Sequence, residues 1–277
     1  MKVGSLFAGI GGFDLGLERA GMTIVWQVEI DAFVRSILAK HWPEVPKYED
    51  VRAVGAHNLE PVDVIAGGFP CQPHSVAGKR RGAKDDRDLW PEMRRIIEEM
   101  RPRWVVAENV PGIRTTILDD VLSDLEGLGY SAGAIVVPAC AVGAPHIRER
   151  VFIVAHANSN GRDGQSVSDV QKGRRGESSD THTGRIRKTF SDAYGFGCPG
   201  WKGLPEAARE AWHVSVERDN AWTVEPDVGR VAYGVPHRVD RIRALGNAVV
   251  PQIVEVLGRF IIAIDKRISG RKDDGDE

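Results

Sequence analysis

The chain has 277 residues, of which 42% are hydrophobic and 27% charged, so it can bury one large core or a core with a smaller companion. A formal net charge of -2 gives no general attraction to nucleic acid, and local basic patches must decide any such binding. Three cysteines, far apart, argue against a disulfide framework and a zinc site, and for a reducing, cytoplasmic compartment. The glycine-broken N-terminus predicts no signal peptide, and no apolar stretch approaches the length of a membrane span.

Short strand-like runs alternate with amphipathic helical patterns up to about residue 156. This alternation predicts an α/β fold with a doubly wound, mostly parallel sheet. We expect strands at Lys2–Phe7, Thr23–Val28, Val62–Ile65, Trp104–Ala107, Ala134–Val137 and Val151–Ala155.

The expected helices carry apolar residues at helical spacing and have recognisable ends. Gly21 closes the first helix, and Asp88 can cap the third, whose first turn tolerates Pro91. We expect helices at residues 12–20, 31–40, 88–100 and 117–128, and a last one that begins at Pro251.

The regular pattern breaks after the last of these strands. Residues 158–189 are rich in Ser, Gly, Asp and Arg and lack a sustained apolar period. These residues are therefore expected to form a loop, and the regular pattern returns at Asp240. The charged end, residues 266–277, is expected to be a flexible tail.

A glycine-rich turn joins the first strand to the first helix, with the sequence Phe7-Ala8-Gly9-Ile10-Gly11-Gly12. Such a turn lets a ligand lie against the backbone, as in nucleotide sites, although the spacing is not that of the dinucleotide motif. Glu29 ends the second strand, at about the right distance for an acid that binds ribose hydroxyls. A tight turn and a solvated carboxylate remain the alternative.

A second turn places a thiol at the end of a buried strand. Cys71 follows Gly67, Gly68 and Pro70, which allow a substrate close to the backbone and hold the cysteine in place. A cysteine fixed there can act as a nucleophile. On its own it is equally well explained as a packing residue, because free cysteines are often buried.

Five blocks stand in order along the chain: Leu6–Phe13, Gly68–Gln72, Glu108–Val110, Arg148–Arg150 and Gly246-Asn247. In this order they resemble the DNA (cytosine-5)-methyltransferases, over about residues 1–156 and 238–265. The resemblance implies a class I S-adenosylmethionine-dependent methyltransferase fold with a small inserted target-recognition domain at residues 157–237. The substrate it implies is cytosine in a specific duplex DNA sequence, flipped out of the helix into the site.

The resemblance also implies catalytic roles. Cys71 matches the nucleophile that adds to C6 of cytosine, and Glu108 matches the acid that protonates or hydrogen-bonds N3. Arg150 matches the arginine that contacts O2, and Arg148 orients the site or binds a nearby phosphate. Asn109 is expected to hold the active-site loops, while His146 stands where the family usually has glutamine.

The cofactor implied is S-adenosylmethionine. Ile30 replaces a more usual bulky aromatic beside the adenine, so stacking there is expected to be weaker. Pro70 and Gln72 are expected to shape the loop that closes over DNA. The implied cofactor contacts are Phe7, Gly9 and Gly11 along the methionine and adenosine, Glu29 at the ribose, Ile30, Asp50 and Val51 near the adenine, and Leu89 and Asn247 at the methionine end.

We therefore expect a monomeric bacterial or phage-type enzyme that acts on double-stranded DNA, and the sequence leaves a cognate restriction endonuclease open. Two alternatives remain. One is a transfer-RNA cytosine-5 methyltransferase with the same fold. The other is a catalytically inactive DNA-binding homologue, against which intact Cys71, Glu108 and Arg150 argue.

Overall fold

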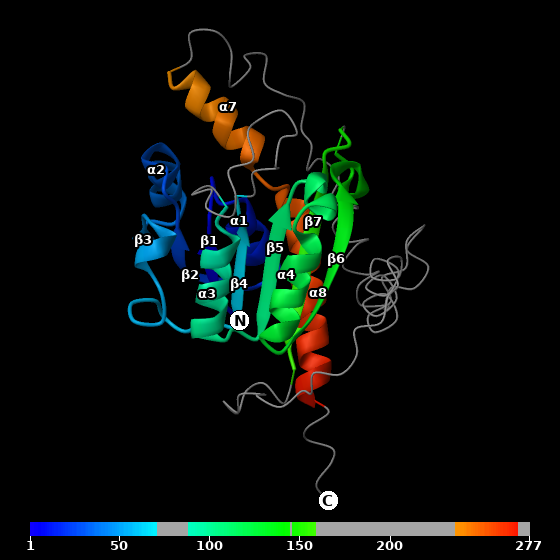
Figure 1. Ribbon diagram of the computed structural model, residues 1–277. Coiled ribbons are helices and arrows are strands. Elements are labelled where there is room, and N and C mark those ends of the chain that lie inside the picture. The colour runs from blue at the N-terminus through cyan, green and yellow to red at the C-terminus, as the bar shows by residue number, and fades with distance from the viewer. Residues whose placement is uncertain (71–87, 145, 159–235, 271–277) are drawn as a thin grey trace, which may run out of the picture.

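The computed structural model describes residues 1–70, 88–144, 146–158 and 236–270. Within these ranges the strands form one seven-stranded sheet in the order β3-β2-β1-β4-β5-β7-β6 (Figure 1). Strands β1 to β5 run parallel, whereas β7 is antiparallel to both β5 and β6. The strands are β1 (Lys2–Leu6), β2 (Thr23–Val28), β3 (Lys47–Tyr48), β4 (Val64–Gly68), β5 (Trp104–Asn109), β6 (Tyr130–Pro138) and β7 (Glu149–Ala157).

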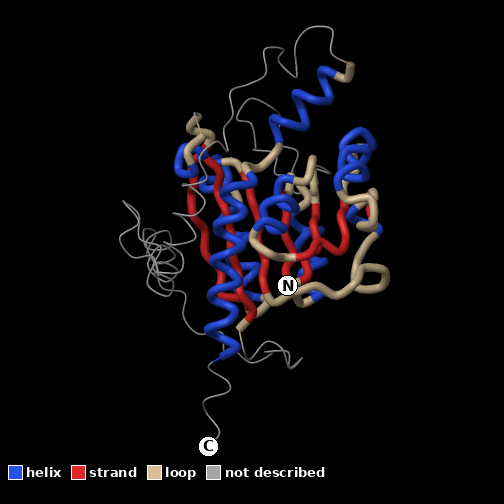
Figure 2. The backbone as a smooth tube through the Cα atoms, turned by 180° about the vertical axis from the view of Figure 1, so that it is seen from behind, coloured by secondary structure: helices blue, strands red, loops and turns tan. Residues whose placement is uncertain are grey.

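Helices cover both faces of this sheet, as Figures 1 and 2 show from opposite sides. Helices α3 and α4 lie on one face, and α1 and α8 lie on the other. The helices are α1 (Gly12–Arg19), α2 (Ala32–His41), α3 (Trp90–Met100), α4 (Leu118–Gly127), α7 (Arg238–Asn247) and α8 (Pro251–Gly270), with short 3-10 turns η1 (Val51–Ala53), η2 (Pro111–Thr115) and η3 (Ala139–Val142).

The central strands divide their side chains between two cores. In β4, Val64 joins the core under α1 and α8, while its neighbour Ile65 joins the core under α3 and α4. Val105 and Val106 of β5 alternate in the same way. Because successive strand residues point to opposite faces, a strand covered on both sides must be apolar throughout. This explains the short unbroken apolar runs in the sequence.

The predicted doubly wound α/β fold is confirmed, with two differences in detail. The last two strands are longer than expected and form an antiparallel hairpin, because only residues 139–148 connect them and a parallel crossover needs a longer connection. The expected tail was wrong for residues 266–270, which continue α8 to Gly270. Ile264 and Ile268 extend its apolar spacing, and Arg267 lies in its last turn, where a cation is favourable. Nearly all of the expected inserted domain lies outside the described residues.

One stretch, Arg238–Gly270, is long and apolar enough to cross a membrane by length and composition, contrary to the expectation from sequence. Its apolar part is α8, in which Ile253, Val254 and Leu257 pack in one core with Phe13 and Leu17 of α1. More than half of the apolar window is buried inside the protein. Core packing accounts for its hydrophobicity.

Candidate active site

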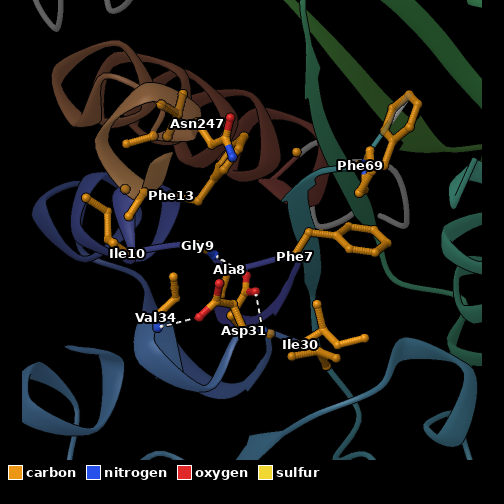
Figure 3. A pocket seen from close by; sticks show the side chains of 18 of the residues that line it. Phe7, Ala8, Gly9, Ile10, Phe13, Ile30, Asp31, Val34, Phe69 and Asn247 are labelled. Atoms are coloured by element: carbon orange, nitrogen blue, oxygen red, sulfur yellow. Dashed lines mark hydrogen bonds between the residues drawn. The ribbon is translucent and has the colours of Figure 1, made fainter. Parts of the chain in front are cut away.

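A cavity of about 440 Å³ opens at the carboxyl ends of the parallel strands (Figure 3). Its walls come from the ends of β1, β2, β4 and β5, from η1, and from α7, which lies above the sheet edge. Ligand sites of open α/β sheets lie at this edge, because the loops that follow parallel strands converge there.

Most of the residues predicted from the sequence line this one cavity, although they come from eight separate segments. Gly11 and Arg148 do not line it, and they border an adjacent hollow instead. Cys71 and Gln72 lie outside the described residues, as does the inserted region. The predicted residues in the cavity wall are Phe7, Gly9, Glu29, Ile30, Asp50, Val51, Pro70, Leu89, Glu108, Asn109, Arg150 and Asn247.

The glycine turn and Glu29 form one hydrogen-bonded unit. Gly9, at a φ of 54°, donates its backbone N–H to Glu29 Oε2 at 2.8 Å. Asp31 donates its backbone N–H to Glu29 Oε1 at 2.9 Å, and its own carboxylate caps α2 through Phe33 and Val34 (Figure 3). Two backbone amides therefore fix the Glu29 carboxylate at the cavity wall, where its remaining lone pairs can accept further hydrogen bonds.

Gly11 has a structural reason to be glycine. Its φ is 84°, and a Cβ atom there would lie 2.3 Å from the ring of Trp42. The motif residue thus serves the turn and its packing against α2. Ile30, in contrast, lies at the mouth of the cavity with 66% of its surface exposed.

Glu108 lies at the end of β5, with 9% of its surface exposed. Its Oε1 is 2.8 Å from Arg150 Nε on the neighbouring strand β7. Burial raises the pKa of Glu108 to about 7, although the positive charges of Arg150 and Arg148 oppose the shift. A carboxyl group with this pKa carries its proton in part of the molecules at neutral pH, so it can both donate and accept one.

Gly68 leaves room for this carboxyl group. It is paired with Glu108 across β4 and β5, and a Cβ atom at Gly68 would lie 2.9 Å from Glu108 Oε2. A larger residue at position 68 would therefore crowd the acid. The close approach explains the second glycine of the Gly67-Gly68 pair.

Asn109 fastens the turn that leads to Cys71. Its Nδ2 donates to the carbonyl of Phe69 at 2.9 Å, and its Oδ1 accepts from Val110 N–H at 2.9 Å. Leu89 N–H donates to the carbonyl of Pro70 at 3.2 Å, so the chain returns beside the point where it leaves the described residues. The expected role of Asn109 in holding active-site loops agrees with these contacts for the described part of the turn.

Arg148 supports the site from outside the cavity. Its Nη2 donates to the carbonyls of Gly246 and Ala248, at 2.6 and 2.8 Å, on either side of Asn247. Of the two expected roles, orienting the site fits this geometry. His146 lies at the surface and borders the same adjacent hollow as Arg148.

Some residues of the cavity wall were not predicted from the sequence. Phe69 and Val110 flank predicted positions, and Asp240 and Arg243 lie on α7. Asp240, Arg243 and Asn247 follow at helical spacing, so they share one face of α7. Helical periodicity counted backwards from Asn247 would have identified the two α7 residues.

Comparison with known proteins agrees with this architecture. The solved structure of a prophage-encoded protein of E. coli, described as a DNA modification methyltransferase, matches with a TM-score of 0.60 at 22% identity, over 95% of this chain and 99% of that one. The Entamoeba histolytica methyltransferase EhMeth matches with a TM-score of 0.58 at 15% identity, over 95% and 98%. The fold is thus that of the α/β methyltransferases.

The sequence model of the C-5 cytosine-specific DNA methylases matches residues 1–212, and the chain belongs to this family. Among curated relatives, the type II methyltransferase M.FnuDI of Fusobacterium nucleatum is 37% identical over 159 residues, 56% of this chain and 46% of its own length. M.HhaI of Haemophilus parahaemolyticus is 34% identical over 158 residues, 55% of this chain and 48% of its own. The matched segment therefore spans about half the length of these relatives.

Proposed function

We propose that the protein is a DNA cytosine-5 methyltransferase, which transfers a methyl group from S-adenosylmethionine to C5 of cytosine in duplex DNA. The observation that carries this proposal is the pair of buried Glu108 and partly buried Arg150, which line the same cavity as the glycine turn and Glu29. One end of the cavity thus offers groups for a nucleoside cofactor, and the other offers an acid and a cation for a pyrimidine ring.

The polar and apolar groups in the cavity wall suit the cofactor. The fixed Glu29 carboxylate suits ribose hydroxyls, and Gly9 leaves the backbone accessible beside it. Phe7, Ile30 and Val51 give this end an apolar wall for a base. When bound, S-adenosylmethionine supplies an electrophilic methyl group. Leu89 and Asn247 remain the expected contacts of its methionine end.

Glu108 and Arg150 prepare the cytosine for attack. A protonated Glu108 donates to N3, which withdraws electrons from the ring and makes C6 electrophilic, while Arg150 donates to O2. The Cys71 thiolate then bonds to C6, and C5 becomes nucleophilic enough to accept a methyl group. A base removes the C5 proton, the Cys71–C6 bond breaks, and the proton held at N3 returns to Glu108.

Double-stranded DNA is the proposed substrate, and the target base must leave the helix to enter a cavity at the edge of the sheet. Flipping costs a few kcal/mol, which contacts to phosphates and grooves must offset. The inserted region 157–237 remains the expected target-recognition domain. A monomeric state, a cytoplasmic location and a cognate restriction endonuclease remain predictions.

A methylation assay tests the proposal directly. The protein is incubated with labelled S-adenosylmethionine and, in parallel, with duplex DNA of varied sequence and with structured RNA. We expect 5-methylcytosine in DNA alone, and none with the Cys71→Ser variant. Methylation of RNA alone would favour the transfer-RNA enzyme. DNA binding without any product or adduct would favour the inactive homologue.

A further inference from the structure

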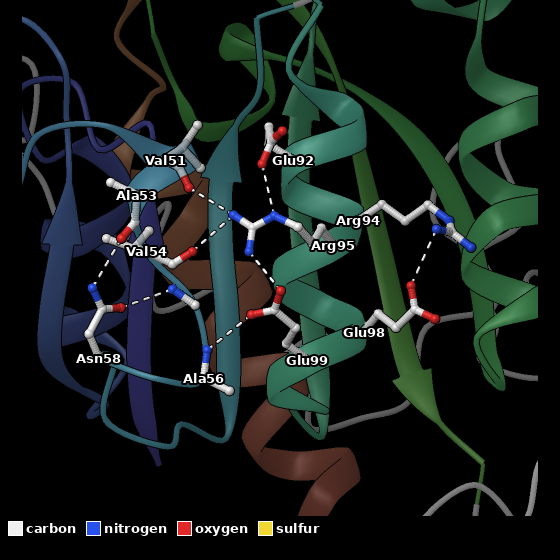
Figure 4. Close-up of polar contacts among 11 residues, drawn as sticks. Val51, Ala53, Val54, Ala56, Asn58, Glu92, Arg94, Arg95, Glu98 and Glu99 are labelled. Carbon is white, nitrogen blue, oxygen red and sulfur yellow. Dashed lines mark hydrogen bonds and ion pairs between the residues drawn. The ribbon is translucent and has the colours of Figure 1, made fainter.

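Arg95 on α3 makes contacts both within its own helix and to a distant segment of the chain (Figure 4). Its Nη2 donates to the carbonyl oxygens of Val51, at 3.0 Å, and Val54, at 2.9 Å. Nε and Nη1 bind the carboxylates of Glu92 and Glu99, at 2.9 and 2.7 Å. One planar guanidinium thus joins its own helix to η1 and to the residue that follows it, more than forty residues earlier in the chain.

The segment that Arg95 holds is a wall of the cavity. Asp50, Val51 and Arg52 all line it, and Val51 belongs to η1, a single 3-10 turn. So short a turn leaves its carbonyls without partners of its own and has little intrinsic stability. Asp50 caps the beginning of the turn by accepting from Arg52 N–H at 2.9 Å, whereas Arg95 donates to the carbonyls of Val51, the first residue of the turn, and of Val54, the residue that follows it.

A second contact from α3 strengthens the attachment. Glu99, which Arg95 orients, accepts from the backbone N–H of Ala56 at 3.1 Å. The same helix follows Leu89, which lines the cavity and is bonded to Pro70, the residue before Cys71. Helix α3 therefore sets the distance between the η1 wall and the turn that leads to the nucleophile.

We propose that Arg95 is a positioning residue for the cofactor, which places the Val51 wall at the distance that the adenine end requires. This inference rests on the proposed function, because it assumes that the η1 side of the cavity receives S-adenosylmethionine. Arg95 itself does not line the cavity and acts through the backbone of η1. Its loss should weaken cofactor binding and leave the chemical step intact.

Arg94 provides a matched control. It precedes Arg95 on the same helix and is similarly exposed, but its ion-pair partners are Glu98 and Asp124, at 3.3 and 3.4 Å. Figure 4 shows Arg94 and Glu98 on the side of α3 away from η1, and Asp124 belongs to α4. Arg95→Met and Arg94→Met remove the same charge from the same helix. Arg95→Lys keeps the charge for Glu92 and Glu99 but cannot reach two carbonyls and two carboxylates at once.

The experiment measures four quantities: the dissociation constant of S-adenosylmethionine by calorimetry, the KM for S-adenosylmethionine and kcat in the methylation of DNA, and the unfolding midpoint without cofactor. We expect the dissociation constant and KM to rise about tenfold in Arg95→Met and several-fold in Arg95→Lys, since each loses charged hydrogen bonds to the wall. Arg94→Met should bind like the unaltered protein, and kcat at saturating cofactor should stay within about twofold. Arg95→Lys serves as the test if Arg95→Met does not fold.

Unchanged cofactor affinity in the Arg95 variants, or an equal loss in Arg94→Met, would overturn the inference alone. The inference would also be overturned if Arg95→Met lost binding free energy for the cofactor only in proportion to its lost stability, and Arg95→Lys restored both in full. Ion pairs within the helix would then explain the effect. If the unaltered protein binds no S-adenosylmethionine, the proposed function fails as well. The two failures are therefore distinguishable.

Discussion

The two ends of the cavity differ in the groups that form them: backbone amides with a carboxylate at one end, and a pair of ionisable side chains at the other. At the end proposed for the cofactor, backbone amides of Gly9 and Asp31 fix one carboxylate, and the wall at Ile30 is open to solvent. At the end proposed for the base, the buried side chain of Glu108 pairs with the partly buried side chain of Arg150. Backbone amides do not titrate, so they hold the Glu29 carboxylate in place without any change in their own charge. Buried ionisable side chains can have their pKa shifted, which suits proton transfer.

The largest effect should come from the base end. Glu108→Gln keeps the shape of the side chain but removes the proton that activates the ring. We expect kcat to fall by about 10²- to 10⁴-fold, with the dissociation constant of S-adenosylmethionine nearly unchanged. Single-turnover methylation and calorimetry measure the two quantities. A variant that loses cofactor affinity instead of turnover would contradict the division between the two ends.

The pH dependence of stability probes the same carboxyl group. Its pKa is raised from 4.5 to about 7 in the folded state, so the folded protein keeps a proton that the unfolded chain has lost. The free energy of unfolding should therefore fall as pH rises from about 4.5 to 7, by roughly 3 kcal/mol for this group. Chemical denaturation between pH 4.5 and 8 measures it.

A matched pair of variants isolates that contribution. Glu108→Gln should flatten the decline between pH 6 and 8. Buried Asp14, whose pKa burial raises to about 6, acts at lower pH, and Asp14→Asn should remove only that part. The same slope between pH 6 and 8 in Glu108→Gln and in the unaltered protein would show that another group titrates there.

Glu29→Gln tests the cofactor end. An amide has one acceptor oxygen, so one of the N–H groups of Gly9 and Asp31 would face a donor, and an acceptor for the ribose is lost. We expect the dissociation constant of S-adenosylmethionine to rise about 10- to 30-fold, with a smaller change in kcat. Glu98→Gln, on the outer part of α3, is the control for a lost carboxylate. If Glu29→Gln and Glu98→Gln bind S-adenosylmethionine with equal affinity, Glu29 does not contact the cofactor.

The smallest effect should come from the exposed wall. Ile30→Trp adds an aromatic surface where the cavity opens, and we expect cofactor affinity to rise about three- to tenfold. Ile30→Ala should lower it slightly. If the tryptophan variant binds no better, the adenine does not lie against residue 30.

The sequence predicted the sheet well because the signal is local. In β4 and β5, apolar runs record burial on both faces, and nearly every expected strand and helix lies within a few residues of the observed one. The motif residues of the cavity were predicted from the resemblance to a known family, and the converging strand ends of the parallel sheet bring them together. What the sequence could not predict depends on contacts between distant segments.

The contacts of Arg95 and Arg148 illustrate that limit, although Arg148 itself was expected to orient the site or bind a phosphate. Each arginine donates to backbone carbonyls, at Val51 and Val54 or at Gly246 and Ala248, and a carbonyl leaves no mark in the sequence. Gly11 shows the converse case. It lies in the motif but packs against Trp42, because a glycine needed for a turn and one needed for a ligand look alike in sequence.

The most direct test traps the reaction at its covalent stage. Duplex DNA with 5-fluorocytosine at the target position, mixed with S-adenosylmethionine and the protein, should give a stable complex, because fluorine cannot leave as the C5 proton does. Mass spectrometry of the digested complex should find the base on the peptide that contains Cys71. An adduct on another residue, or ordinary methylation of normal DNA with no adduct on the fluorinated duplex, would contradict the account.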